Sequence, residues 1–411
     1  MFSYSILNIV IVFLKMLFSF LITKYIALTG GPIAIAYLGQ FQSLLSIFQN
    51  LPNGTSNGVI AITPKSDNKK GIWAASFYIG VGVFSLLLIS AFFSKQLMIV
   101  VFSDSSFSKY YIFLVILYPL YHLYSLLNAI NTSQEKFKLY FKSNIIMMII
   151  YILTMLSFKF YFSIGDIYIW TALFIPLCSV GICLFNIFYD KSFSFNFKSP
   201  KIEQISGILK FFFASLVSVV FTPIILIIIR NIISDNYNDI IMGNWQAMWR
   251  ISELYTTVIM LSISSIILPK FANSKSALEI RHVFLSSLKI VIPLYIICFS
   301  IIFFKTDFII SLLYSSNFVI SKVALLYQLL GDFFKIGCWL FTYLLISQFR
   351  LKITVFLEVF MGIVFVSFSK LLIVNYGVSG ISISYLITQA VVFFILFFVC
   401  NKYIFGGYNE I

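Results

Sequence analysis

The sequence has few charged residues, and this scarcity decides its class. Asp, Glu, Lys and Arg together make up 10% of the 411 residues, and only 14 residues are acidic. A soluble domain of this length needs many more charges on its outer surface, so a soluble globular protein is excluded. Hydrophobic residues reach 61%, and Phe alone supplies 48 positions. Apolar stretches of about 18 to 25 residues, long enough to cross a bilayer as a helix, recur along the chain. This composition predicts a polytopic membrane protein.

Cysteine and histidine are also scarce. The five cysteines all fall in apolar stretches without the spacing of metal ligands, which predicts buried thiols: Cys178, Cys183, Cys298, Cys338 and Cys400. The two histidines, His122 and His282, have no metal-binding partners in the sequence. Neither a Ser-His-Asp pattern nor a phosphate-binding loop is present, so no catalytic residue, cofactor or metal is expected.

The apolar stretches predict about twelve transmembrane helices, with boundaries that are approximate to several residues. The expected helices cover 4–23, 34–61, 72–93, 109–130, 143–161, 167–188, 208–231, 240–268, 285–304, 321–348, 353–373 and 379–401. Three of them (34–61, 240–268 and 321–348) are too long for a straight crossing and should tilt or project beyond the membrane. The first helix is expected to be a retained span rather than a cleaved signal peptide.

Pro52, Asn53, Gly54 and Gly58 lie inside the second predicted helix. Because proline removes a backbone donor and glycine weakens a helix, we expect a bend or an unwound turn there.

Basic residues are distributed unequally between the two sets of loops. Loops that follow even-numbered helices hold sixteen Lys and Arg residues, and the opposite side holds eight, among them Arg230. Basic residues favour the cytoplasmic side, so both termini are expected to be cytoplasmic. The net charge of +14 is therefore interpreted as a topology signal, and no nucleic-acid partner is expected.

Four pairs of segments repeat in the same order along the chain. Residues 38–49 resemble 242–253, 62–65 resemble 267–270, 92–107 resemble 303–318, and 133–138 resemble 347–352, at offsets that grow slowly from 204 to 214. These offsets span six predicted helices, an even number, so the two halves share one orientation in the membrane. The predicted fold is an all-α polytopic membrane protein of about twelve transmembrane helices. The helices form two six-helix bundles, residues 1–195 and 196–411, related by pseudo-twofold symmetry along the membrane normal.

The repeated segments 92–107 and 303–318 each have a charged start, an apolar middle and a Ser- or Asn-rich end. This pattern predicts a short interfacial helix in each half, on the outer side of the membrane.

Polar and charged residues inside the predicted spans are the candidate site residues, because they are costly in hydrocarbon and line cavities or pair with one another. The candidates for substrate binding are Lys15, Gln42, Gln246, Arg250 and Lys335, and those for ion coupling or charge pairing are Glu253, Asp332 and Glu358. Gln246, Arg250 and Glu253 follow i, i+4, i+7 spacing and share one helix face. Asp332 and Lys335 are three residues apart and can pair within their helix. Two readings stay open: pairs that only orient helices, or cations that line an anion-binding cleft.

Three features of this sequence resemble a known family. They are Lys15 followed by Lys24 and the dipeptide Gly31-Pro32; the run GNWQ…ISELY in 243–255; and QLLGDFFKIGCWLFTYLLI (328–346), which is followed by Glu358. The chain resembles the polysaccharide flippases for O-antigen or other lipid-linked oligosaccharides. These belong to the multidrug/oligosaccharidyl-lipid/polysaccharide exporter (MOP) superfamily. The resemblance covers the whole chain, and its most specific parts are 243–255 and 328–346. Arg250 departs from the pattern, which leaves the specificity of its contact open.

The resemblance implies a transporter rather than an enzyme. It implies alternating access across a cationic cleft between two six-helix lobes, in the inner membrane of a bacterium. Its substrate would be an undecaprenyl-pyrophosphate-linked oligosaccharide, and its other partners membrane lipids and polysaccharide assembly proteins such as a polymerase and a chain-length regulator. Charge-assisted bonds from Arg and Lys suit the pyrophosphate. Gln246, Trp245 and Trp249 are of the types that bind sugars, although the two tryptophans could instead anchor the helix at the interface.

Three rival functions remain, and for one of them, a channel, the repeat architecture and the paired charges favour a carrier instead. A membrane glycosyltransferase of the O-antigen polymerase type would be expected to carry a large outer loop, and the predicted outer loops here stay short. A drug or cation antiporter of the same superfamily would need acidic residues in the N-terminal half, which has almost none inside its spans.

Overall fold

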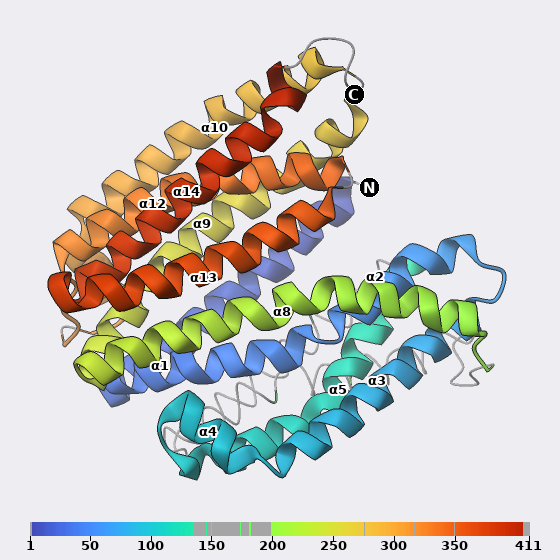
Figure 1. Cartoon of the computed structure of the whole chain (residues 1–411), viewed down its shortest axis with the longest axis horizontal. Helices are drawn as coiled ribbons and strands as arrows, with labels where there is room; N and C mark the ends of the chain where they lie inside the picture. Colours follow the sequence, from blue (N-terminus) through green and yellow to red (C-terminus); the bar gives the residue numbers. More distant parts are fainter. Residues whose placement is uncertain are drawn as a thin grey trace. The chain divides into compact units, whose positions relative to one another are not determined.

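A computed structural model describes residues 2–134, 199–274, 276–315, 317–348 and 350–405, together with isolated positions between 145 and 181 (Figure 1). The described part is built of helices. Their bounds are α1 Phe2–Asn50, α2 Asn53–Ile62, α3 Lys69–Ala91, α4 Ser94–Phe102, α5 Ser108–Ser133, α8 Ile202–Asn236, α9 Asp239–Asn273, α10 Ala277–Phe304, α11 Thr306–Leu313, α12 Lys322–Ser347, α13 Leu351–Tyr376 and α14 Val378–Phe405. The predicted spans 143–161 and 167–188 lie outside the described residues.

Eight helical stretches in the described part are long and apolar enough to cross a membrane. Their outward faces carry large apolar side chains such as Leu86, Ile290 and Val374, which are more than half exposed, as expected of side chains that meet lipid. The helix α9, which carries Gln246, Arg250 and Glu253, falls outside this set. The prediction of a multi-pass helical membrane protein is confirmed.

The first two predicted helices are joined more closely than the sequence indicated. We expected a connection over 24–33, but α1 runs from Phe2 to Asn50 with a sharp kink at Gly31. Gly31 has φ of +61° and ψ of −156°, a conformation that only glycine adopts without strain. Pro32 then starts the next helical segment, where its missing N–H costs nothing. The Gly31-Pro32 dipeptide therefore replaces the expected loop.

The predicted bend near Pro52 is confirmed, because α1 ends at Asn50 and α2 begins at Asn53 after a two-residue turn. The two short helices expected from the repeats are also present, as α4 within 92–107 and α11 within 303–318. Their position at the outer membrane interface remains a prediction.

The chain folds into two compact units. Unit 1 comprises residues 1–22 and 38–227, and unit 2 comprises residues 23–37 and 228–411. In unit 1, α2, α3 and α5 share an apolar core with the start of α8, which includes Val59, Ile72 and Ile208. In unit 2, the core lies among α9, α10, α12 and α14 and is rich in aromatic residues, such as the stacked pair Phe284 and Phe341. The domain boundary expected at residues 195 and 196 remains a prediction.

Three contacts fasten the segment 23–37 within unit 2. The Lys24 ammonium donates to the carbonyl of Ser311 in the last turn of α11 at 2.7 Å, and the Tyr37 hydroxyl donates to Asp239 Oδ2 at 2.9 Å. Gly243 of α9 packs on the backbone of Pro32 so closely that a Cβ atom would overlap the Pro32 carbonyl. The middle of α1 is thus part of the same packed body as α9 and α11.

Candidate substrate-binding site

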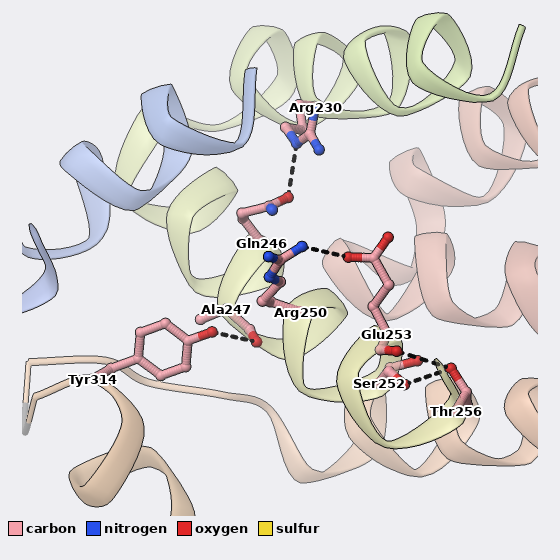
Figure 2. Close-up of polar contacts among 8 residues, drawn as sticks. All are labelled: Arg230, Gln246, Ala247, Arg250, Ser252, Glu253, Thr256 and Tyr314. Carbon is pink, nitrogen blue, oxygen red and sulfur yellow. Dashed lines mark hydrogen bonds and ion pairs between the residues drawn. The ribbon is translucent and has the colours of Figure 1, made fainter. Parts of the chain in front are cut away.

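The helix α9 positions most of the candidate residues. It begins after Asn238, whose side chain accepts a hydrogen bond from the amide of Ile241 at 2.9 Å and so caps the first turn. Farther along α9, Arg250 Nη1 contacts Glu253 Oε2 at 3.0 Å (Figure 2), and the two side chains are 28% and 38% exposed, respectively. Residues three apart on a helix are neighbours, so the shared face predicted for Arg250 and Glu253 is realised as an ion pair. The pair is accessible enough to meet a ligand.

The third residue on this face, Gln246, binds an arginine that the sequence analysis did not select. Arg230 of α8 is 2% exposed, and its Nε donates to Gln246 Oε1 at 2.7 Å (Figure 2). Arg250 and Glu253 lie close enough to act electrostatically on the Arg230 guanidinium. Two arginines and one glutamate therefore gather where α8 and α9 face each other, and positive charge prevails there.

Asp332 of α12 lies in a cage of hydroxyl groups. Its carboxylate is fully buried and accepts hydrogen bonds from Ser252 at 2.7 Å to each oxygen, from Tyr255 at 2.7 Å and from Tyr385 at 2.8 Å. Ser252 and Tyr255 come from α9, and Tyr385 comes from α14. A buried carboxylate is tolerated where several donors satisfy its oxygens. The cage therefore joins three helices of unit 2 through one side chain.

Lys335 has a different partner from the one that its spacing suggested. The intrahelical pair expected between Asp332 and Lys335 is not formed, because the hydroxyl cage occupies both carboxylate oxygens. The ammonium instead lies 5.1 Å from the ring centroid of Trp339 and 5.8 Å from that of Trp249. Aromatic faces attract a cation at such distances. Lys335 is half-buried, and the two rings hold its charge without a carboxylate.

The two tryptophans of α9 form part of an aromatic core. Trp245 is 1% and Trp249 is 9% exposed. Their rings stack at 5.3 Å, and Trp249 also packs against Phe365 and Tyr385. Neither sugar stacking nor interfacial anchoring fits side chains so fully covered, so both expectations for them are wrong in this conformation. Their packing holds α9 against α13 and α14.

The remaining candidates are placed as follows. Gln42 is half-buried in unit 1, and Glu358 is half-buried on α13 in unit 2. The side chain of Lys15 lies outside the described residues. Cys338 and Cys400 are buried and Cys298 is half-buried, which confirms the expected buried thiols for Cys338 and Cys400, whereas Cys178 and Cys183 fall outside the described part. The structure thus brings together Gln246, Arg250 and Glu253 on one helix face of unit 2.

Sequence reasoning missed Arg230 and the three hydroxyl donors of the cage. Arg230 was counted among the outer-side basic residues, because it stands near the end of a predicted span. In the structure α8 continues for six residues beyond Arg230, to Asn236, so Arg230 lies more than one turn inside the helix. Ser252 and Tyr255 stand in the stretch 243–255 that the family resemblance singled out, but hydroxyl side chains are too common in such helices to be selected.

Comparison with known proteins supports the resemblance. No family model matches the chain. Two curated proteins, the lipid III flippases of Escherichia coli (strain K12) and Shigella flexneri, are 29% identical over 184 residues. That region is 45% of this chain and 44% of each relative, so the match spans less than half the length of these relatives.

Solved structures match nearly the whole chain. An inward-facing multidrug resistance MATE family transporter of the MOP superfamily aligns with a TM-score of 0.77 and 15% identity over 94% of each chain. The lipid II flippase MurJ, in an inward closed conformation, aligns with a TM-score of 0.72 and 17% identity over 98% of this chain and 88% of that one. At 15% and 17% identity, the structural similarity is evidence of a shared fold alone. These two solved structures are of a transporter and a flippase. The chain therefore has the predicted all-helical fold, which it shares with these solved structures.

Proposed function

We propose that this protein is a flippase that moves an undecaprenyl-pyrophosphate-linked oligosaccharide, an O-antigen repeat unit, from the cytoplasmic to the periplasmic leaflet of a bacterial inner membrane by alternating access. The observation that carries the proposal is the excess of cations among the charged residues of α8, α9 and α12. More than one turn from the ends of these helices, the cations are Lys210, Arg230, Arg250 and Lys335, and the acids are Glu253 and Asp332. The partial match to lipid III flippases supports a lipid-linked substrate.

The geometry suits an anionic headgroup. The Arg250 guanidinium is held by Glu253 at 3.0 Å, and 28% of its side chain is exposed, so a phosphate can approach it. Guanidinium groups bind phosphate oxygens through paired, charge-assisted hydrogen bonds. Lys335 adds a second accessible cation, held over two indole rings. The lipid tail can stay in the bilayer while these groups bind the pyrophosphate.

The charge distribution favours this function over a drug or cation antiporter. Among the described membrane-spanning helices of unit 1, the acidic side chains are limited to Glu203 at the start of α8. A carrier of cations needs carboxylates to bind its cargo, and the described spans of unit 1 offer only this one, in the first turn of α8. In unit 2, Asp332 is enclosed by its own hydroxyl donors, so it is not free to pair with an organic cation.

The proposal includes an orientation and partners. With both termini in the cytoplasm, as the distribution of basic residues predicts, the sugar would be delivered to the periplasmic side. A polymerase and a chain-length regulator would be the partners that use it there.

Complementation tests the function. Bacterial strains that each lack one flippase are made to express this chain, and the polysaccharide that returns to the cell surface is identified. We expect one class of O-antigen to return with the native chain and to be reduced with Arg250→Gln at equal membrane abundance. Purified protein in liposomes should move undecaprenyl-pyrophosphate-linked sugar to the opposite leaflet. Inserted protein that restores no polysaccharide and moves no such lipid in liposomes contradicts the proposal.

A further inference from the structure

We propose that Arg230 is a positioning residue that orients the amide of Gln246 and thereby makes the anion site selective for a diphosphate over a monophosphate. This inference rests on the proposed function, because it assigns a role within the same site. It starts from the hydrogen bond between Arg230 Nε and Gln246 Oε1, which is 2.7 Å long and joins α8 to α9 (Figure 2).

This hydrogen bond fixes both ends of the amide. An arginine side chain only donates hydrogen bonds, so the amide atom that faces it must be the oxygen. Because the oxygen and the nitrogen sit on one planar carbon, the direction of the NH2 group is then determined. Gln246 is 5% exposed, and the only hydrogen bond of its amide to the described residues is the one that its oxygen accepts from Arg230. The amide therefore has two donor hydrogens left for a ligand.

Burial separates the roles of the two arginines. Arg230 is 2% exposed and Gln246 is 5% exposed, so both side chains are buried and bound to each other beside a more exposed arginine. Arg250 has 28% of its side chain exposed and follows Gln246 by one helical turn, on the same face. A ligand bound at Arg250 would have the Gln246 amide one helical turn away, with Arg230 bound to the oxygen of that amide.

Two adjacent donor groups distinguish between phosphate ligands. A diphosphate has oxygens on two linked phosphorus atoms and can bond to the guanidinium and to the amide at the same time. A monophosphate is satisfied by the guanidinium alone. Misdirecting the amide should therefore weaken diphosphate binding and leave monophosphate binding largely unchanged, which is an effect that a general loss of structure would not produce.

Binding measurements on the full chain in lipid nanodiscs test this inference. The probes are undecaprenyl pyrophosphate and undecaprenyl phosphate, and the dissociation constant of each is measured. The variants are Arg230→Met, Gln246→Leu, the combination of both, and Arg230→Lys, whose ammonium can still donate to the amide oxygen. Gln246→Glu keeps an oxygen for Arg230 and removes the NH2 donors, so it tests the amide even if Arg230→Met fails to fold.

We expect Arg230→Met, Gln246→Leu and Gln246→Glu each to weaken binding of the diphosphate lipid about tenfold, the usual effect of losing a hydrogen bond to a charged group. Binding of the monophosphate lipid should change less than about twofold for Arg230→Met and Gln246→Leu. Arg230→Met should add no further loss in the Gln246→Leu background, and Arg230→Lys should recover part of the selectivity.

Other results overturn the inference. If Arg230→Met weakens binding of both lipids equally, Arg230 does not act through the amide. The same conclusion follows if Arg230→Met weakens diphosphate binding as much in the Gln246→Leu background as in the native chain. Unchanged selectivity in Gln246→Glu has the same meaning, and in these cases the proposed function stands. A native chain that binds neither lipid, or in which Arg250→Gln alters neither affinity, removes the proposed function together with the inference.

Discussion

The hydroxyl cage around Asp332 makes a quantitative prediction for the stability of unit 2. Tyr255→Phe removes one hydroxyl that donates to Asp332 Oδ2 at 2.7 Å and changes little else, because the ring remains. The carboxylate stays fully buried and cannot turn to water for a replacement. We therefore expect Tyr255→Phe to lower the free energy of unfolding by about 1.5 to 3 kcal/mol, the usual range for a hydrogen bond to a charged group.

Tyr295→Phe is the matched control. The Tyr295 hydroxyl is also in unit 2 and donates at 2.8 Å to a neutral acceptor, the carbonyl of Leu329 on α12. Its loss should cost about 0.5 to 1.5 kcal/mol, as for hydrogen bonds between neutral groups. The two variants remove the same atom from the same residue type. The difference between their losses in unfolding free energy therefore reports the contribution of the Asp332 charge.

A double-mutant cycle sharpens the test. Asp332→Asn keeps an acceptor oxygen in the cage and removes its charge, so Tyr255→Phe should cost less in that background, with a coupling of about 1 kcal/mol or more. The measurement is unfolding of the purified protein in mixed micelles titrated with a denaturing detergent. Equal costs of Tyr255→Phe in the Asp and Asn backgrounds, or a larger cost for Tyr295→Phe, would refute the charged hydroxyl cage.

Three further predictions follow from the topology and the packing. Cysteine introduced at Asn68 should resist a membrane-impermeant thiol reagent in intact cells, whereas cysteine at Ser106 should react, because the basic residues place the first loop in the cytoplasm; reversed labelling would invert the orientation. Gly243→Ala should destabilise the protein by about 1 to 3 kcal/mol, since its methyl group would overlap the Pro32 carbonyl. Gly82→Ala, with nothing within 4 Å of the new methyl group, should be neutral or slightly stabilising, and equal unfolding midpoints for the two variants would contradict the close contact. Arg250→Gln should reduce surface glycan at least about tenfold, with protein abundance within about twofold and partial recovery in Arg250→Lys; normal glycan display in Arg250→Gln would assign the headgroup to other residues.

The sequence alone predicted the helical architecture, because apolar runs and internal repeats can be recognised without knowledge of the tertiary structure. Runs of apolar residues mark the helices, since a backbone in lipid must satisfy its hydrogen bonds within each span. The repeats at 92–107 and 303–318 predicted the short helices α4 and α11. The spacing of Arg250 and Glu253 predicted their common face, because neighbours on one helix depend only on the helical period.

Only the tertiary structure decided which groups the buried polar side chains meet. The spacing allowed Asp332 to pair with Lys335, its neighbour on α12, but its partners stand 53 to 80 residues away on α9 and α14. Arg230 looked like a basic residue at the end of a span, and it lies buried against Gln246. Helical periodicity tells which residues share a face, but not which helix packs on that face. Among helices made mostly of Ile, Leu and Phe many pairings bury similar apolar area, so the partners follow from the packing of the whole bundle.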